Sequence, residues 1–263
     1  MTRIAFLLVM TLPCPAIEIV AHRGASHDAP ENTLPAVELA WERDADAVEV
    51  DVYLSKDGEV VAIHDKTTKR VAGEDRAVVD QTLAELKALD VGRWKHAQYA
   101  DTRIPTISEV LATIPDGKKL VIEIKGDDES IVPTLEEAVD RSGKRGQVMF
   151  IAFSYDLIAA AKKRMPNIPA YWLYGFRTQE RLYYRIVTNG DLIQKAKTAN
   201  LDGLDLRHDG AFDKPFVDMV RAEGMQVYVY TVNDPDRARA LDQMGVAGIT
   251  TDRPGFMRKA LQQ

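Results

Sequence analysis

Along most of the chain, short apolar runs rich in β-branched residues alternate with longer segments whose apolar positions recur about every three to four residues. The short runs are typical of buried strands, and the longer segments are typical of helices that bury one face. The pattern predicts eight strands, which begin at Ile17, Ala47, Leu120, Val148, Ala170, Gly203, Gln226 and Gly248.

Helical patterns fill the intervals between these strands and follow the last of them. Eight strand-then-helix units in roughly 250 residues indicate an α/β fold of the TIM (β/α)8 barrel type. The alternative is an open doubly wound sheet, but no Gly-x-Gly-x-x-Gly follows the first strand, which weakens a dinucleotide-binding version of it. The predicted helices cover residues 33–43, 82–89, 108–114, 131–142, 155–164, 178–200, 212–223, 235–244 and 254–261.

One stretch interrupts the alternation. Lys56-Asp57-Gly58 predicts a hairpin turn between a strand at 47–54 and a partner at 60–64. Residues 66–104 then interrupt the alternation, with one short predicted helix at 82–89, and we expect them to form a small inserted cap segment over the barrel mouth. The barrel domain would span residues 17–263. We also expect Asn32 or Thr33, and further on Ser108, to cap helix N-termini.

Composition is that of an ordinary globular chain. Its 263 residues are 46% hydrophobic and 28% charged, which is enough to bury a large core. The formal charge of −6 and the pI near 5.5 argue against a general nucleic-acid surface. No internal run approaches the roughly 18–20 apolar residues of a membrane span, so no integral span is expected.

The N-terminal residues resemble an export signal. Arg3 precedes an apolar run at 4–10, and residues 1–16 then fit a signal peptide cleaved after Ala16, which predicts a periplasmic or secreted protein. The alternative is an apolar plug that closes the barrel floor of a cytoplasmic protein. Pro13 makes a lipid anchor on Cys14, the sole cysteine, a poor fit. A mature chain without cysteine is compatible with any redox compartment.

Carboxylates gather at two predicted strands. Glu49 and Asp51 are two residues apart and therefore share one face of their strand, while Glu123 and Lys125 do the same on the next barrel strand. Three carboxylates from two strands suit a hard divalent cation, Mg²⁺ or Ca²⁺, and zinc is less favoured. The alternative is that Glu49 and Asp51 face solvent on an exposed strand.

Two histidines stand near predicted strand ends beside these carboxylates, His22 and His64. A buried charge costs several kcal/mol, roughly, unless it is paired, so a fold alone would not select this cluster. We interpret it as a reaction centre, in which an imidazole with a pKa of about 6.5 suits proton transfer. His96 and His208 lie outside any motif and are interpreted as structural or surface residues. Three aromatic side chains are expected to pack between helices and barrel: Trp41, Tyr53 and Trp172.

Eight short motifs follow one another along the chain: His22-Arg23-Gly24, Pro30-Glu31-Asn32-Thr33, Glu49-x-Asp51, His64-Asp65, Arg103-Ile104-Pro105-Thr106, Glu123-x-Lys125, Tyr230-Thr231-Val232-Asn233 and Thr250-Thr251-Asp252-Arg253-Pro254. In this order the set resembles the glycerophosphodiester phosphodiesterases. The resemblance covers nearly all of the chain after residue 17 and implies a TIM barrel with an inserted cap, a divalent metal, and hydrolysis of glycerophosphodiesters to glycerol 3-phosphate and an alcohol.

The resemblance also implies residue roles. His22 and His64 would be the acid–base pair, with Arg23 and Lys125 on the substrate phosphate. The metal ligands would be Glu49, Asp51 and Glu123. Two positions depart from the family's pattern, because Tyr230 stands where a tryptophan is usual and His27 where a small residue is common. Both departures concern the substrate pocket more than the chemistry.

Alternatives to hydrolysis remain open. A lyase that acts on lipid head groups could stop at a cyclic phosphate, because either water or the neighbouring glycerol hydroxyl can attack phosphorus. A non-catalytic phosphoester-binding protein would not need two histidines, and enolate chemistry on Mg²⁺ would more naturally use a lysine base. We expect Trp94, Tyr99 and Tyr230 to meet the leaving alcohol, with a modest preference for choline by cation–π attraction.

Overall fold

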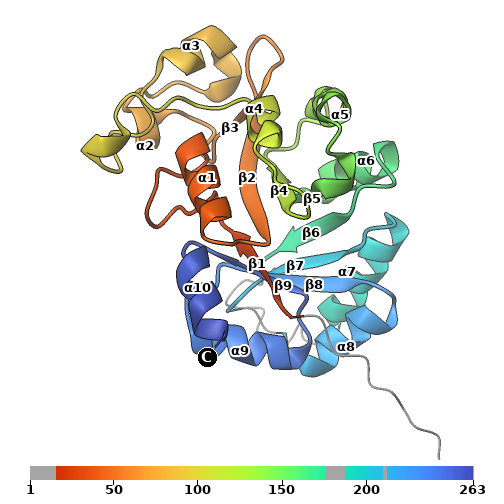
Figure 1. Cartoon of the computed structure of the whole chain (residues 1–263). Helices are drawn as coiled ribbons and strands as arrows, with labels where there is room; N and C mark the ends of the chain where they lie inside the picture. Colours follow the sequence, from red (N-terminus) through yellow and green to blue (C-terminus); the bar gives the residue numbers. More distant parts are fainter. Residues whose placement is uncertain (1–15, 176–186, 210–211, 263) are drawn as a thin grey trace, which may run out of the picture.

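The computed structural model describes residues 16–175, 187–209 and 212–262, and its centre is a closed parallel barrel (Figure 1). The first barrel strand pairs with both the second and the last, which closes the sheet. This confirms the TIM barrel and excludes the open doubly wound sheet. The barrel strands are β1 (Glu18–Ala21), β2 (Ala47–Leu54), β4 (Lys119–Ile124), β5 (Val148–Ala152), β6 (Ala170–Tyr174), β7 (Gly203–Arg207), β8 (Gln226–Tyr230) and β9 (Gly248–Thr251).

Helices lie outside the barrel, as the apolar periodicity predicts. Several helices begin and end at the predicted residues. The helix expected at 178–200 is described only from residue 187, because residues 176–186 lie outside the described part. The helices that cover the barrel are α1 (Leu34–Glu42), α4 (Ile107–Ala112), α5 (Ile131–Ser142), α6 (Tyr155–Arg164), α7 (Val187–Thr198), α8 (Lys214–Ala222), α9 (Pro235–Met244) and α10 (Pro254–Leu261), with the 3-10 turn η3 (Arg145–Gln147) before β5.

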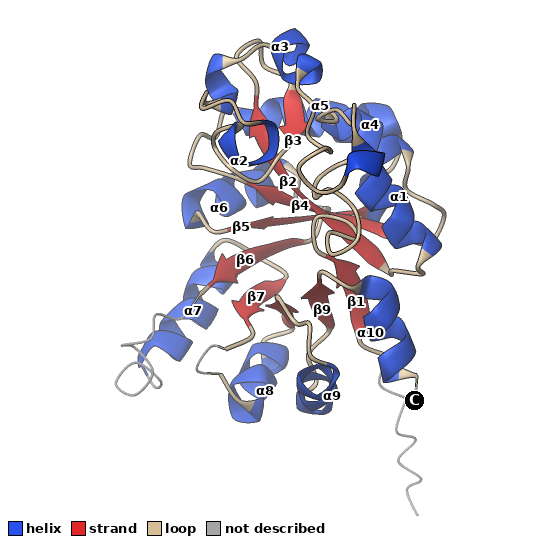
Figure 2. Cartoon of the chain, turned by 90° about the vertical axis from the view of Figure 1, so that its left-hand side faces the viewer, coloured by secondary structure: helices blue, strands red, loops and turns tan. Residues whose placement is uncertain are grey.

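The predicted hairpin follows β2. The short strand β3 (Val60–Ala62) pairs antiparallel with β2 and lies outside the closed barrel. The chain then runs through α2 (Lys69–Ala72), η1 (Val78–Asp80), α3 (Leu83–Ala88) and η2 (Ala97–Tyr99) before α4. These elements project from one end of the molecule (Figure 2) and have a small apolar cluster of their own. That cluster contains Val61, Ile63, Val71, Val78, Leu86, Val91 and Ile104.

One predicted cap is wrong. Helix α4 begins at Ile107 with Thr106 as its N-cap, and Ser108 is inside the helix. The Thr106 hydroxyl accepts a hydrogen bond from the backbone of Glu109, whose carboxylate accepts one from the Thr106 backbone. This reciprocal pair satisfies two N–H groups that a helix start leaves free, so Thr106 starts the helix two residues earlier.

Alternation along β2 decides which side chains enter the barrel. Val48, Val50 and Val52 belong to the large apolar core beneath the helices, so Glu49 and Asp51 point to the barrel interior. Strand β4 repeats the arrangement, and Glu123 enters the interior two residues after Val121 of the inner cluster. In β2 and β4 the inner apolar cluster takes Ala47 and Val121, which precede the acidic residues, so the acidic side chains lie nearer the carboxyl ends of these strands.

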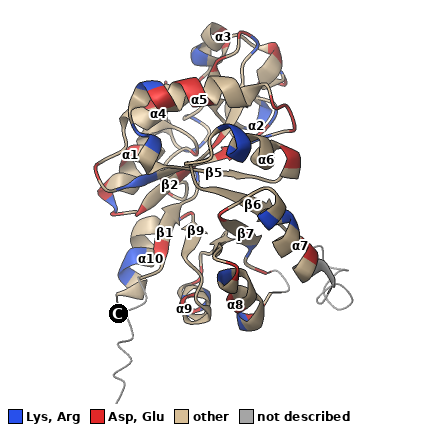
Figure 3. Cartoon of the chain, turned by 90° about the vertical axis from the view of Figure 1, so that its right-hand side faces the viewer, with Lys and Arg blue, Asp and Glu red and all other residues tan. Residues whose placement is uncertain are grey.

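No helix in the described ranges is long and apolar enough to span a membrane. Figure 3 shows basic and acidic residues side by side on α5, α6 and α7, as expected for helix faces exposed to solvent.

Candidate active site

Three carboxylates meet inside the barrel at the ends of two neighbouring strands. In the parallel pairing of β2 and β4, Asp51 lies opposite Glu123, and Glu49 lies one inward position below Asp51. Each of the three offers an oxygen within 4.8 Å of the others, and all three are buried. The prediction that these side chains converge is therefore confirmed by the geometry.

Burial and mutual repulsion make it energetically costly for all three carboxyl groups to be ionised at once. Burial, followed by the charges of Asp51 and Glu123, raises the pKa of Glu49 well above its usual value. The pKa of Glu123 rises to about 7, chiefly through burial and then through Asp51. Asp51 behaves oppositely: burial would raise its pKa, but the cations Lys125 and Arg23 lower it.

This donor set fits a hard divalent cation. Oε1 of Glu49 is buried and accepts no hydrogen bond from the described residues, so one ligand oxygen is ready for an ion. Carboxylate oxygens are the preferred ligands of Mg²⁺ and Ca²⁺, and an ion bound among them would relieve the repulsion that raises the pKa values.

Two cationic side chains, Arg23 and Lys125, flank the carboxylates. Arg23 follows β1 in a left-handed conformation (φ 56°), and its backbone N–H donates to Oε2 of Glu49 at 2.7 Å. Its guanidinium lies 3.2 Å from Asp51 and donates to Glu31 at 3.0 Å. Lys125 donates to Glu123 at 2.7 Å and lies 3.3 Å from Asp51. Both cations are held by carboxylates at the edge of the cluster.

Asn32 holds Asp51 in place. Its side-chain amide donates to Oδ2 of Asp51 at 2.8 Å, and its carbonyl oxygen accepts from the Asp51 backbone N–H at 2.9 Å. The residue is buried and has a φ of 56°, a conformation that asparagine adopts more readily than most residues. Of the two predicted caps, Asn32 or Thr33, Thr33 is the N-cap of α1, and Asn32 contacts the acidic cluster.

Each predicted catalytic histidine is paired with an aspartate. Nδ1 of His22 lies 2.6 Å from Asp252, which follows β9, and Nδ1 of His64 lies 2.6 Å from Asp65. A carboxylate at Nδ1 favours the ring form that carries its hydrogen there and leaves Nε2 to exchange a proton. The sequence placed Asp65 and Asp252 in motifs without giving them this part.

The hairpin brings His64 back to the acidic cluster. Because β3 runs antiparallel to β2, the chain returns toward the barrel, and the backbone N–H of Ile63 donates to the carbonyl oxygen of Asp51 at 3.0 Å. His64 is thereby close enough to Asp51 to help lower the pKa of that carboxyl. Burial, opposed by the charge of Asp51, lowers the pKa of His64 below its usual value.

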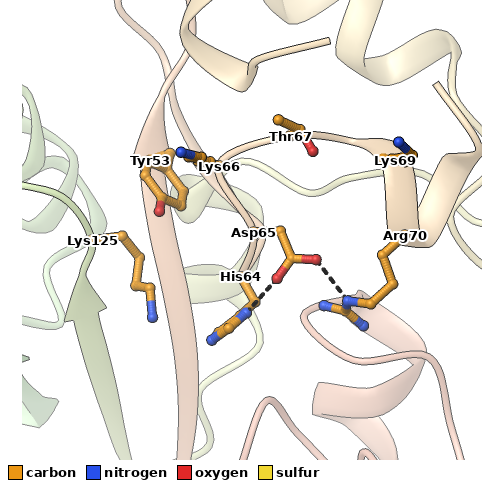
Figure 4. Close-up of a pocket in the computed structure, with 8 residues that line it drawn as sticks. All are labelled: Tyr53, His64, Asp65, Lys66, Thr67, Lys69, Arg70 and Lys125. Carbon is orange, nitrogen blue, oxygen red and sulfur yellow. Dashed lines mark hydrogen bonds and ion pairs between the residues drawn. The ribbon is translucent and has the colours of Figure 1, made fainter. Parts of the chain in front are cut away.

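A cavity of about 580 Å³ opens beside His64 and Lys125 (Figure 4). Tyr53 lines it, although the sequence predicted that this side chain packs between helices and barrel. Trp94 and Tyr230, predicted as pocket residues, do not line this cavity, and their part in substrate binding stays a prediction. The lining residues are Tyr53, His64, Asp65, Lys66, Thr67, Lys69, Arg70 and Lys125.

The two predicted aromatic pocket residues lie in different surroundings. Trp94 is 42% exposed, and the charged groups of Arg70 and Lys95 each lie 5.8 Å from its ring centre. Tyr230 ends β8 and meets the exposed Phe153 edge to face, with ring centres 5.9 Å apart. His27, the other departure from the motif pattern, pairs with Asp28 at 2.9 Å.

One carboxyl group inside the barrel, that of Asp205, was not predicted from the sequence. Asp205 of β7 is buried, and its Oδ1 has no hydrogen-bond partner among the described residues. Burial, and after it the charge of Glu123, raises the pKa of Asp205 well above its usual value. The sequence Leu204-Asp205-Leu206 could have predicted this position. Leu204 and Leu206 pack under the helices, and side chains alternate along a strand, so Asp205 points into the barrel.

Comparison with known proteins gives a consistent result. A sequence model of the glycerophosphoryl diester phosphodiesterase family matches residues 22–256. A glycerophosphodiester phosphodiesterase of Caldanaerobacter subterraneus is 32% identical over 245 residues, which cover 90% of this chain and 94% of the relative. One from Bacillus subtilis is 31% identical over 257 residues, which cover 91% of this chain and 85% of the relative.

Solved structures resemble this chain over nearly its whole length. A phosphodiesterase of Oleispira antarctica, determined in complex with the product sn-glycerol 3-phosphate, superposes with a TM-score of 0.84 at 28% identity. The match covers 94% of this chain and 98% of that one. A glycerophosphodiester phosphodiesterase of Thermotoga maritima superposes with a TM-score of 0.73 at 27% identity, covering 92% and 97%.

Proposed function

The chain belongs to the glycerophosphoryl diester phosphodiesterase family, and on that premise we propose that it hydrolyses glycerophosphodiesters to glycerol 3-phosphate and an alcohol, with a divalent cation and two histidines. The observation that carries the proposal is the arrangement of the barrel mouth. A buried three-carboxylate cluster is bordered by two cations, while the chain brings two histidines, each fixed by an aspartate, to the same end of the barrel.

The negative charge on the phosphate would be stabilised by the ion held in the carboxylate cluster and by the two cations beside it. Glu49, Asp51 and Glu123 would hold the ion, which when bound supplies positive charge to the non-bridging phosphate oxygens. Arg23 and Lys125 add fixed charge beside it. Their ion pairs to the carboxylates orient both groups before substrate arrives, and such preorganised charge is what stabilises a developing anionic transition state.

Proton transfer falls to the histidines. With Nδ1–H donated to its aspartate, each ring presents Nε2 to the substrate, as a base when neutral and as an acid when protonated. One ring takes the proton of the attacking water as its oxygen bonds to phosphorus. The other gives a proton to the alcohol oxygen as the bond from that oxygen to phosphorus breaks. The products are glycerol 3-phosphate and the free alcohol.

Product identity tests the proposal. With glycerophosphocholine and Mg²⁺, phosphorus NMR should show the diester signal replaced by that of glycerol 3-phosphate, while choline appears in equal amount. Accumulation of a cyclic phosphate would assign the attack to the glycerol hydroxyl instead of water. Tight binding without turnover would point to a phosphoester-binding protein. His96→Ala is the matched control, since His96 accepts a hydrogen bond from the Gln98 backbone outside the cluster, and it should keep full turnover.

Export is proposed separately. Arg3 and the apolar run at 4–10 support removal of residues 1–16, a segment outside the described residues except for Ala16. N-terminal sequencing of the protein from a bacterial host tests this, and a mature chain that begins at Ile17 is expected. An intact N-terminus in the cytoplasmic fraction would favour the cytoplasmic alternative.

A further inference from the structure

Four of the eight residues that line the cavity beside His64 are lysine or arginine. Lys66, Lys69, Arg70 and Lys125 face it, and Asp65 is the one carboxylate among its lining residues. In Figure 4, Lys125 and Tyr53 lie on one side, Lys69 and Arg70 on the other, and Lys66 beside Tyr53. The chain as a whole is acidic, with a formal charge of −6, so this positive surface is a local feature.

The four cations are not equivalent. Lys125 is held by Glu123, Lys69 donates to Asp75 at 2.8 Å, and Arg70 donates to Asp65 at 2.6 Å. Lys66 is the exception in the lining, because its side chain makes no hydrogen bond or ion pair with any residue in the described ranges. The ammonium of Lys66 is therefore available to form an ion pair with an anionic group of the substrate.

The position of Lys66 relative to His64 is fixed by the backbone. The carbonyl oxygen of Lys66 accepts a hydrogen bond from Val78 at 3.0 Å, and the next residue, Thr67, forms a β-bridge with Ala77. The backbone of Lys66 is thus held two residues beyond a proposed catalytic histidine, and its side chain reaches the cavity from there. A volume near 580 Å³ accommodates a small polar molecule.

Lys125 borders two kinds of surface. Its ammonium lies 6.0 Å from the ring of Phe153, which meets Tyr230. Lys125 also lines the cationic cavity. Every glycerophosphodiester carries the same uncharged glycerol and the same phosphate, so only the leaving alcohol varies in charge. The cationic cavity would then select among alcohols.

We infer that this cavity binds the leaving alcohol and selects alcohols that carry an additional anionic group, such as a phosphomonoester, with Lys66 as the specificity-determining residue. The inference rests on the proposed function. It replaces the expectation of a choline preference, because Arg70 and Lys95 already lie against the ring of Trp94 and a quaternary ammonium there would meet like charges.

Three substrates test the inference: glycerophosphocholine, glycerophosphoinositol and glycerophosphoinositol 4-phosphate. All release glycerol 3-phosphate, and the last two differ only in one phosphate group. Efficiency, as kcat/KM at low salt and a fixed concentration of free Mg²⁺, should be about tenfold higher for the phosphorylated ester than for glycerophosphoinositol, and lowest for the choline ester. Added salt should reduce the difference.

Variants assign the effect to Lys66. Lys66→Gln should lower the ratio of the phosphorylated to the unphosphorylated ester about tenfold, and Lys66→Glu should reverse the preference. Lys163→Gln, an exposed lysine on α6, should leave the ratio unchanged. Equal efficiency on all three substrates, or an unchanged ratio in both Lys66 variants, would overturn the inference and leave the proposed function standing. No glycerol 3-phosphate from any of them would overturn the proposed function itself.

Discussion

His64 and Asp65 are adjacent in the chain, and their side chains turn toward one another so that Nδ1 of the imidazole lies 2.6 Å from Oδ1 of the carboxylate. The other carboxylate oxygen of Asp65 accepts from Nε of Arg70, also at 2.6 Å. The aspartate is therefore fixed from two directions, and it fixes in turn which nitrogen of His64 faces the cavity.

Replacing that carboxylate should disturb proton transfer more than binding. Asp65→Asn presents an amide that can donate as well as accept, so the ring of His64 loses its preference for one tautomer. We expect kcat to fall roughly 10²-fold, the lower end of what a positioned acid or base contributes, with little change in KM. Steady-state kinetics with glycerophosphocholine measures this. Asp218→Asn, at an exposed pair on α8, should behave as wild type.

The two histidines should act on one step. His22→Ala and His64→Ala should each lower kcat by roughly 10²–10⁴. The double variant should lose far less than the product of the two single losses, because groups that serve one transition state are not additive. A single variant with near-native turnover would remove that residue from the proton-transfer pair.

Two substitutions of Asn32 distinguish the effect of its backbone conformation from the effect of its hydrogen bonds to Asp51. Both Asn32→Ala and Asn32→Gly remove the two hydrogen bonds to Asp51, so each should weaken Mg²⁺ binding by about tenfold. Only alanine also meets the strain of the left-handed conformation, which should cost it about 1 kcal/mol of unfolding free energy relative to glycine. Calorimetric titration and urea unfolding measure the two effects, and equal Mg²⁺ affinity in wild type and both variants would contradict the orienting role.

Asp205 should make the metal-free protein less stable as pH rises. A carboxyl whose pKa is raised by folding holds its proton more tightly in the folded state, so its contribution is full below about pH 4 and is lost as pH rises toward the folded-state pKa. Asp205→Asn cannot ionise. Its unfolding free energy relative to wild type, measured in chelator, should rise from about zero at pH 4 to roughly 1–3 kcal/mol at pH 8. A difference that stays constant with pH would show that Asp205 titrates normally.

Most of the fold was predictable from periodicity. Short apolar or alternating runs located all eight barrel strands, because each strand is largely buried on both faces. The cap of α4 was the exception. Ser108 is a good capping residue by type, but Thr106-x-x-Glu109 is the capping-box pattern, and its reciprocal hydrogen bonds decide where the helix begins.

The site was predictable in its composition but less so in its connections. Spacing two residues apart placed Glu49 beside Asp51 on one face, and the order of strands brought Glu123 to them. The partners came from farther away in the sequence: Asp252 reaches His22 across 230 residues because β1 and β9 close the barrel. No local pattern could reveal that pairing, nor that Tyr53 and Lys66 share a cavity with Lys125.

The central claim is that the buried carboxylates hold the ion needed for cleavage of a glycerophosphodiester. The direct measurement is release of glycerol 3-phosphate from glycerophosphocholine by enzyme that has been exhaustively chelated and then given defined ions. Activity should fall to background after chelation and return with Mg²⁺ or Ca²⁺ but not with Na⁺ or K⁺, and Glu49→Gln should need far more of the ion while it stays folded. Full activity in the metal-stripped enzyme would contradict the account.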